Sequence, residues 1–376
     1  MKTALLQKEK HLGQMADWRE EKYRSPELRH LFLELTLRCN ERCLHCGSSC
    51  GETAPGRPAA TGGEPGNATG RPTEVTLETY KRLLDEVKED FDIRRLQLCI
   101  TGGEPLLRRD FFDIMAYAHS LGYTWGMTSN GTLITKEVAR KLKETGMGTI
   151  SVSLDGLRES HDAFRRTPGG FDRALEGINN LVDCGAFKNV QVTTVVHHGN
   201  IGELDSLFNI LDRIDIDSWR IINMEPMGRA LDHPELMMTD GDYRRMFGYI
   251  RLMRQKGYPV SYGCSHFLGL DYEREVRNWY YLCTAGIYIA SIMANGDIAA
   301  CLDIERRPET IQGNIYRDRF SDVWKNGFSF FRRDKAGLNE KCAACQDRRF
   351  CAGDSWHSWN FEENKPRVCF KGLLWQ

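Results

Sequence analysis

The sequence predicts an α/β protein whose core is a parallel sheet built from strand–helix units. Six short segments with the apolar pattern of strands alternate with segments that carry apolar residues at helical spacing. Polar turn peptides follow several of these strands, at the ends where parallel folds gather functional residues. Six such units form either an open sheet or a partial barrel.

The elements follow one another as βα units should. The first strand, 31–37, reads LFLELTL, with its leucines on one side and Glu34 and Thr36 on the other, a polar face that suits a barrel lumen. The other expected strands are 93–100, 123–129, 148–154, 188–196 and 218–224, and the expected helices are 76–91, 109–122, 135–146, 171–185, 201–214 and 240–256. Segment 287–301 predicts a β-hairpin that turns at Asn295 and Gly296.

Length and composition indicate a cytoplasmic metalloprotein. The chain has 376 residues, a formal net charge of −1 and 13 cysteines. Its balanced charge excludes bulk binding to nucleic acid or to an anionic membrane, and no apolar run is long enough to span a bilayer. Without a signal-peptide pattern, a secreted disulfide framework is disfavoured. We expect an N-terminal extension at 1–30, a barrel at 31–258 with a flexible insertion at 51–73, and a cysteine-rich domain at 259–376.

The pentapeptide TGGEP occurs at 61–65 and again at 101–105. The first copy lies in a stretch rich in Gly and Pro without periodicity, so we expect it to have no role. The second copy joins an expected strand to an expected helix, where parallel folds bind ligands. Its glycines allow the backbone to approach a ligand closely, and Glu104 can accept a hydrogen bond from an ammonium group.

Three cysteines follow the first strand at C-x3-C-x2-C spacing: Cys39, Cys43 and Cys46. A structural zinc site takes four protein ligands, and most iron–sulfur clusters also take four cysteines. Three thiolates on a four-iron cube leave one iron open to a cofactor or substrate. A zinc site completed by Cys50 is the alternative, but its spacing is unusual for zinc. We expect Cys50 to be a free or structural thiol.

Together, these motifs resemble those of the radical S-adenosylmethionine (SAM) enzymes. CNERCLHC resembles the cluster loop of that superfamily, the second TGGEP its GGEP segment, and SNGT at 129–132 and SLDG at 153–156 its SAM-contacting strand ends. The resemblance covers almost the whole chain and implies a partial (β/α)6 TIM-like barrel. It also implies a [4Fe–4S] cluster whose open iron binds SAM, which is cleaved to a 5′-deoxyadenosyl radical. The implied SAM-binding residues are Gly102, Gly103, Glu104, Pro105, Asn130, Ser153 and Asp155.

The C-terminal cysteines resemble those of the SPASM domain, which extends radical SAM enzymes that modify peptides and proteins. In that family the domain holds two auxiliary [4Fe–4S] clusters. The ligands implied for auxiliary II are Cys342, Cys345, Cys351 and Cys369. Auxiliary I has Cys283, Cys301 and Cys264, but Ser355 stands where the family has another cysteine, so this cluster is incompletely ligated. Its fourth ligand is Asp354, Ser355, water or the substrate. A four-cysteine zinc site at 342–369 is the alternative.

Three features have two readings each. Cys264 is either a ligand of auxiliary I or a thiol that donates a hydrogen atom near the radical. Arg165, which follows SLDG, either pairs with the SAM carboxylate or caps a solvated helix, and we expect the latter. EPMGRA at 225–230 is either a loop near SAM or an ordinary turn.

The resemblance implies an oxidoreductase that matures ribosomally synthesised and post-translationally modified peptides (RiPPs). Hydrogen abstraction from a precursor peptide would lead to a crosslink, an epimerised centre or a backbone excision. The alternatives are an anaerobic sulfatase-maturating enzyme that forms formylglycine, a small-molecule radical SAM dehydrogenase, and a non-catalytic iron–sulfur or zinc scaffold. Ser355 disfavours the sulfatase-maturating type, because those enzymes carry a complete auxiliary I set.

The expected partners are the precursor peptide and a flavodoxin- or ferredoxin-type reductant. Related peptide maturases often carry a leader-binding winged-helix domain before the barrel, and segment 1–30 is too short for one. We therefore expect either a separate leader-recognition protein or direct binding of the peptide.

Overall fold

A computed structural model describes residues 2–48, 50, 74–279 and 281–374. Its main feature is a ten-stranded sheet of order β10-β9-β8-β1-β2-β3-β4-β5-β6-β7. The strands are β1 (His30–Glu34), β2 (Gln97–Thr101), β3 (Thr124–Ser129), β4 (Met147–Ser153), β5 (Asn189–Val196), β6 (Ser218–Asn223), β7 (Val260–Tyr262), β8 (Ile289–Ile292), β9 (Asp297–Ala299) and β10 (Ile311–Asn314). All pairs from β8 to β7 are parallel, and β9 and β10 continue antiparallel.

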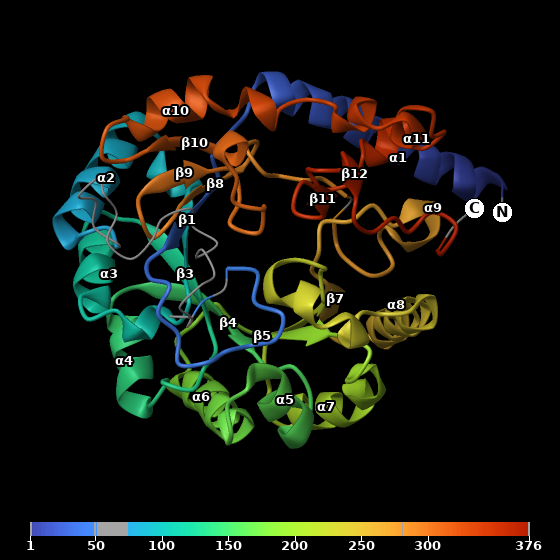
Figure 1. The fold of residues 1–376 in the computed structure, drawn as a ribbon. Helices are drawn as coiled ribbons and strands as arrows, with labels where there is room; N and C mark the ends of the chain where they lie inside the picture. Colours follow the sequence, from blue (N-terminus) through green and yellow to red (C-terminus); the bar gives the residue numbers. More distant parts are fainter. Residues whose placement is uncertain (1, 49, 51–73, 280, 375–376) are drawn as a thin grey trace.

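The helices lie around the outside of this sheet, which curves without closing (Figure 1). The longer ones are α1 (Lys2–Arg24), α2 (Leu77–Asp90), α3 (Phe111–Ser120), α4 (Lys136–Glu144), α5 (Arg158–Arg165), α6 (Gly170–Cys184), α7 (Leu204–Leu211), α8 (Asp240–Gln255) and α10 (Phe320–Asn326). The short ones are α9 (Gly269–Tyr272), α11 (Glu340–Ala343) and α12 (Arg348–Cys351), and β11 (Trp359–Asn360) pairs with β12 (Lys365–Pro366). The predicted α/β partial barrel is thus confirmed.

The core explains why these elements form where the sequence predicts them. Leu31 and Leu33 are fully buried on one face of β1, and Leu35, just after its end, is fully buried as well, as alternation requires. Helix α2 begins after Thr76, whose hydroxyl accepts a hydrogen bond from the Thr79 N–H, and N-cap bonds of this kind stabilise a helix by about 1 kcal/mol. The apolar face of α2 then packs on the sheet, and Tyr80 is fully buried there.

Three parts of the fold differ from the sequence prediction. The expected helix at 201–214 is a 3-10 turn followed by the shorter α7. Strand β7 has only three residues, too few to show a periodicity. The hairpin of β8 and β9 turns at Gly296, whose φ of 87° suits glycine, as expected. It does not stand apart, however, because β8 pairs with β1 and joins the main sheet.

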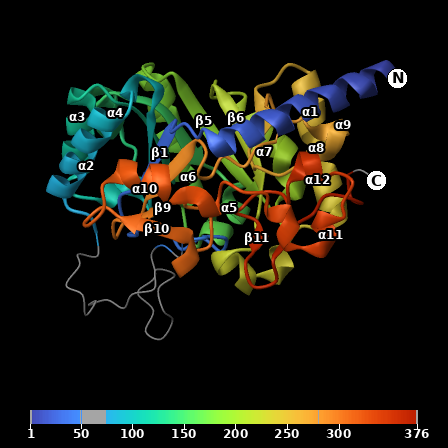
Figure 2. The same ribbon diagram turned by 90° about the horizontal axis from the view of Figure 1, so that it is seen from above.

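The N-terminal helix α1 lies alongside the cysteine-rich part of the chain (Figure 2). The guanidinium of Arg19 donates to the carbonyl oxygens of Arg349 and Phe350 at 2.6 and 2.8 Å. These carbonyls belong to α12, so Arg19 also compensates the negative end of that short helix. None of the described helices is long and apolar enough to cross a membrane. The segment 51–73, which holds the first TGGEP copy, lies outside the described residues.

Candidate active site

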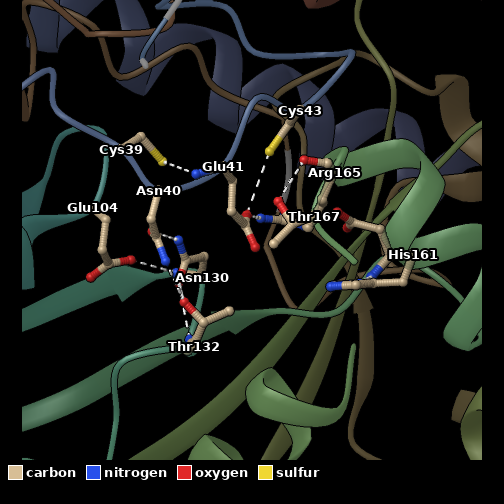
Figure 3. A network of polar contacts seen from close by, with 12 residues as sticks. Cys39, Asn40, Glu41, Cys43, Glu104, Asn130, Thr132, His161, Arg165 and Thr167 are labelled. Atoms are coloured by element: carbon tan, nitrogen blue, oxygen red, sulfur yellow. Dashed lines mark hydrogen bonds and ion pairs between the residues drawn. The ribbon is translucent and has the colours of Figure 1, made fainter. Parts of the chain in front are cut away.

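The loop after β1 carries the first three cysteines and is organised by Glu41. The Glu41 N–H donates to Cys39 Sγ at 3.4 Å, and the Cys43 thiol lies 3.6 Å from Glu41 Oε2 (Figure 3). Burial raises the pKa of Cys39 to about 11 and raises that of Cys43, and the nearby Cys46 adds to both shifts. Both groups are therefore thiols that must lose a proton when a metal binds. Three sulfurs gathered in one loop fit an iron–sulfur cluster with one open iron.

The EPMGRA segment holds this loop in place. The Arg229 guanidinium donates to the carbonyl oxygens of Cys43 and Cys50 at 2.8 and 3.0 Å, and the Arg229 N–H donates to that of Cys46. A hydrogen bond from Cys50, aided by the charge of Arg229 and opposed by burial, lowers the pKa of Cys46 to about 6. The EPMGRA segment therefore holds the cysteine loop through the hydrogen bonds of Arg229. The Cys50 thiol is a hydrogen-bond partner of Cys46.

The glycines of the second TGGEP are required by the cysteine loop itself. A Cβ on Gly102 would lie 2.3 Å from the Thr36 carbonyl oxygen, and one on Gly103 would lie 2.2 Å from that of Arg38. The N–H groups of Gly103 and Glu104 donate to these same two oxygens at 2.7 and 2.8 Å. The glycines therefore permit a close approach between two protein segments, and their expected approach to a ligand stays a prediction.

Replacing Gly103 by alanine will accordingly destabilise the protein, because the new Cβ must push the cysteine loop away. We expect a loss of about 1–3 kcal/mol in unfolding free energy, typical of overpacking, measured by urea denaturation. The matched control is Gly202→Ala, because a Cβ at Gly202 meets nothing within 4 Å. Equal stability of the two variants would contradict the observed contact.

Glu104 is the centre of a second set of contacts. Its carboxylate is fully buried and accepts hydrogen bonds from Ser129 Oγ at 3.0 Å, from the Asn130 N–H at 2.9 Å and from the Leu106 N–H at 3.3 Å. Burial raises the pKa of Glu104 to about 7, although these hydrogen bonds oppose the shift. Within the protein, Glu104 thus binds the TGGEP turn to the end of β3; its acceptance of a hydrogen bond from an ammonium group stays a prediction.

The end of β3 is also joined to the cysteine loop. Asn130 Nδ2 donates to Asn40 Oδ1 at 2.8 Å, and Asn40 Nδ2 donates to Thr132 Oγ1 at 2.8 Å (Figure 3). Asn40 stands between the first two cysteines, so the SNGT turn and the cysteine loop share one network of hydrogen bonds. The sequence analysis missed Asn40 and Glu41, although both lie inside the cysteine motif.

Arg165 is buried rather than exposed, so the expectation of a cap on a solvated helix is wrong. Its guanidinium donates to Asp155 Oδ2 and to Glu41 Oε2, both at 2.7 Å. Asp155 Oδ1 accepts from the Val195 N–H at 2.8 Å, and that carboxylate is fully buried. The SLDG turn, the end of β5 and the cysteine loop are therefore tied through one arginine, because two buried carboxylates need a buried cation.

The remaining SAM-site candidates lie at the same end of the sheet. Pro105 is buried at the start of the 3-10 turn after β2, and Ser153 is half-buried at the last position of β4, opposite Thr193 in register. The fold therefore gathers the ends of β1, β2, β3 and β4 around the cysteine loop. The parallel pairing of these strands places all four ends on one edge.

The C-terminal cysteines form two groups. Burial raises the pKa values of Cys342, Cys351 and Cys369, and neighbouring cysteines of the same group, Cys345 included, add to the shifts. Burial likewise raises the pKa of Cys301, with Asp303 and Cys283 adding to it. Four sulfurs in one group suit an iron–sulfur centre. The second group brings Cys283 and Cys301 together.

Asp354, one of the four candidates for the fourth ligand of auxiliary I, forms hydrogen bonds to other groups. Its Oδ2 lies 2.5 Å from His266 Nδ1, and its Oδ1 accepts from the Phe267 N–H at 2.8 Å. Its φ of 66° is left-handed, a strained conformation outside glycine. These bonds favour a role in holding His266 over metal ligation. Ser355 Oγ lies 3.3 Å from His357 Nε2.

His266 is a buried group that sequence reasoning missed. It is fully buried, and its Nε2 lies 2.6 Å from Glu225 Oε1 while its Nδ1 faces Asp354. Burial lowers its pKa, but Asp354 and Glu225 outweigh that effect and raise the pKa to about 10. No local sequence pattern predicts that His266 is buried and paired, because its partners Glu225 and Asp354 are 41 and 88 residues away in sequence.

Cys264 lies after β7, near the same groups. Burial raises the pKa of its thiol, Glu225 adds to the rise, and Tyr262 and Arg220 oppose it. The side chains that act most strongly on this thiol thus come from the ends of β6 and β7. Cys264 has two expected roles, cluster ligand and hydrogen-atom donor.

Two family models match the chain: "Radical SAM superfamily" over residues 33–211 and "Iron-sulfur cluster-binding domain" (SPASM) over residues 283–346. An AdoMet-dependent heme synthase of Methanosarcina barkeri is 30% identical over 346 residues, which span 85% of this chain and 89% of that protein. Mycofactocin maturase MftC of Mycobacterium tuberculosis is 30% identical over 329 residues, which span 85% of this chain and 76% of that protein.

Solved structures agree in fold. Streptococcus suis SuiB bound to precursor peptide SuiA aligns with a TM-score of 0.67 at 19% identity, over 92% of this chain and 76% of SuiB. That identity shows a shared fold only. The two family matches imply SAM, a [4Fe–4S] cluster and auxiliary iron–sulfur binding, which the gathered cysteines fit. Since the heme synthase relative is matched over most of both chains, the protein belongs to the radical SAM superfamily and carries a SPASM domain.

Proposed function

We propose that this protein uses SAM-derived radical chemistry to modify a ribosomally synthesised precursor peptide. The observation that carries the proposal is the polar interior of the barrel. Gln97 Nε2 donates to Thr149 Oγ1 at 3.2 Å, and the hydroxyls of Ser151 and Thr193 lie 2.6 Å apart. Such donors and acceptors suit a peptide backbone better than the apolar faces of a flat aromatic macrocycle.

Arg220 extends this polar interior. Its Nε donates to Thr193 Oγ1 at 3.0 Å, and no carboxylate among the described residues forms an ion pair with it within 4 Å. Burial lowers its pKa, while Cys264 and Asp303 oppose that effect. A half-buried guanidinium with free N–H groups suits a carboxylate of the substrate.

In this proposal Cys39, Cys43 and Cys46 hold a [4Fe–4S] cluster. SAM bound at that cluster supplies a 5′-deoxyadenosyl radical for hydrogen abstraction. The chain's own part is positioning. Glu104, Asn130 and Asp155 fix the strand ends around the cysteine loop, and Gly102 and Gly103 let those segments approach one another. Two auxiliary clusters, on Cys342, Cys345, Cys351 and Cys369 and on Cys283 and Cys301, are part of the same proposal.

We further propose that Cys264 is a lumenal thiol that donates hydrogen rather than a cluster ligand. The groups that act most strongly on its thiol are Glu225, Asn223, Tyr262 and Arg220, none of them a cysteine, whereas Cys283 acts on Cys301. Cys264→Ala should therefore retain the wild-type iron content and alter only the reaction outcome, whereas Cys301→Ala should lose iron. Iron and sulfide analysis of the two reconstituted variants decides this, since equal iron loss in both would make Cys264 a ligand.

A second candidate is a heme-forming reaction, which the similarity to heme synthase favours. The test incubates reconstituted enzyme anaerobically with SAM and dithionite. One arm adds precursor peptides encoded beside the gene, and the other adds iron coproporphyrin III. We expect 5′-deoxyadenosine together with a mass change in a peptide. Conversion of the porphyrin with unmodified peptides would overturn the proposal, and no 5′-deoxyadenosine in either arm would indicate a scaffold.

The cellular setting belongs to the proposal as well. We propose a cytoplasmic enzyme that takes electrons from a flavodoxin- or ferredoxin-type reductant, with the precursor peptide either presented by a separate leader-recognition protein or bound directly. We also propose the domain division at 258/259. Strand β7, which follows that boundary, pairs with β6 of the barrel, so the two parts share one sheet.

A further inference from the structure

A lysine is buried between the two groups of C-terminal cysteines. Lys335 begins a 3-10 turn (Lys335–Leu338) and is 3% exposed. Its ammonium donates to the backbone carbonyl oxygen of Asp354 and lies 4.8 and 5.5 Å from the ring centres of Trp356 and Trp359. These contacts hold the side chain in one place.

Lys335 lacks the partner that a buried ammonium normally has. No carboxylate among the described residues forms an ion pair with it within 4 Å. The Asp354 carboxylate is bonded to His266 and to the Phe267 N–H instead. A charge withdrawn from water without a counter-ion is costly. The carbonyl and the two aromatic rings compensate only part of that cost, so the charge needs a further partner.

The candidates for that partner are the cysteines. The ammonium lies 4.8 Å from the ring of Trp356, whose backbone N–H donates to Cys283 Sγ at 3.4 Å. It also donates to the carbonyl oxygen of Asp354, whose backbone N–H donates to the Cys351 carbonyl oxygen at 3.0 Å. The ammonium therefore lies next to residues that contact one cysteine of each group, and Cys283 and Cys351 accordingly oppose the lowering of its pKa by burial. Another lysine near these cysteines, Lys371, is 3.4 Å from Cys345 Sγ but is already paired with Asp347 at 2.9 Å.

We propose that Lys335 is the counter-cation of the auxiliary iron–sulfur centres and sets their reduction potential. The inference rests on the proposed cysteine ligands. When thiols lose their protons to iron, the site gains negative charge, and one-electron reduction adds more. A fixed positive charge in a medium of low dielectric constant stabilises the reduced form more than the oxidised form. Charge near a cluster is among the factors that set its potential.

The test is a redox titration of the full-length, anaerobically reconstituted protein, followed by electron paramagnetic resonance. The neutral variants are Lys335→Met and Lys335→Gln, and the second can still donate to the Asp354 carbonyl. At the wild-type midpoint, we expect the reduced-to-oxidised ratio of the auxiliary centres to fall about tenfold or more, equivalent to about 59 mV for a one-electron couple. The SAM-binding cluster should keep its potential and serves as an internal reference.

The matched control is Lys341→Met, which removes the same charge from an exposed residue beside Cys342. Solvent screens that charge, so little shift is expected. An unchanged ratio in both Lys335 variants with iron retained, or an equal shift in the control, would overturn the inference. If both neutral variants lose auxiliary iron while Lys335→Arg keeps it, the need for charge is supported; loss in Lys335→Arg too would overturn it. Wild-type protein without iron at the C-terminal cysteines would overturn the ligand proposal itself.

Discussion

Replacing Cys39, Cys43 and Cys46 together by alanine will abolish 5′-deoxyadenosine formation and remove about four irons per chain, the content of one cubane cluster. The three sulfurs lie in one loop that Glu41 and Arg229 hold, and no other group of cysteines adjoins the ends of β1 to β4 among the described residues. The measurement is iron and sulfide analysis of anaerobically reconstituted protein, combined with chromatography of the SAM cleavage products.

The same analysis counts the clusters. We expect about twelve irons in the wild type and about eight in the triple variant if both auxiliary clusters assemble, or about eight and four if Ser355 prevents auxiliary I from forming. The control is Cys184→Ala at the C-terminal end of α6, where the side chain packs against the hydrophobic core; this variant should keep all iron. Unchanged iron in the triple variant, or zinc at the C-terminal site, would show that the cysteines have been misassigned.

The second large effect concerns Glu104. In Glu104→Gln, an amide nitrogen replaces one of the two carboxylate oxygens, which together accept from three donors, those of Ser129, Asn130 and Leu106. Each donor left without an acceptor costs about 1–3 kcal/mol, and the TGGEP turn loses its link to β3. We therefore expect SAM affinity to fall by about tenfold or more, measured by equilibrium binding to reconstituted protein.

The chain supplies its own control for this substitution. Glu64 occupies the same place in an identical pentapeptide, so Glu64→Gln makes the same chemical change in the other TGGEP. We expect Glu64→Gln to bind and cleave SAM as the wild type does. If Glu64→Gln were impaired and Glu104→Gln were not, our assignment of the two copies would be reversed.

The barrel could be predicted because the sequence patterns that indicate its strands and helices are local. The alternation in 31–37 and the apolar face of 76–91 predict β1 and α2 from periodicity alone. The cysteine loop and the second TGGEP follow β1 and β2, which are neighbours in the sheet, so adjacent strand ends bring them together as expected. Sequence reasoning thus located the candidate site by placing motifs on strand ends.

The contacts that individual residues make could not be predicted, because their partners are distant in sequence. Arg165 is 124 residues away in sequence from its partner Glu41, and no residue pattern near Arg165 predicts a buried ion pair. Glu34 was expected on a polar lumen face. Its partners could not be predicted: it forms a buried ion pair with Arg306 and accepts from the Ala294 N–H, 260 residues away. In both cases the contact depends on tertiary packing.

The place of β1 in the sheet has a consequence for how the enzyme is made. β1 is hydrogen-bonded to β2 on one side and to β8 on the other, so the first strand of the sheet in chain order gains its second neighbour only when residues 289–292 have been synthesised. Until residues 289–292 are synthesised, the strand that precedes the cysteine loop exposes one unpaired edge. Contacts of such sequence separation form slowly. Factors that deliver iron and sulfide to the nascent chain would therefore meet a cysteine loop that follows a half-paired strand until residues 289–292 are made.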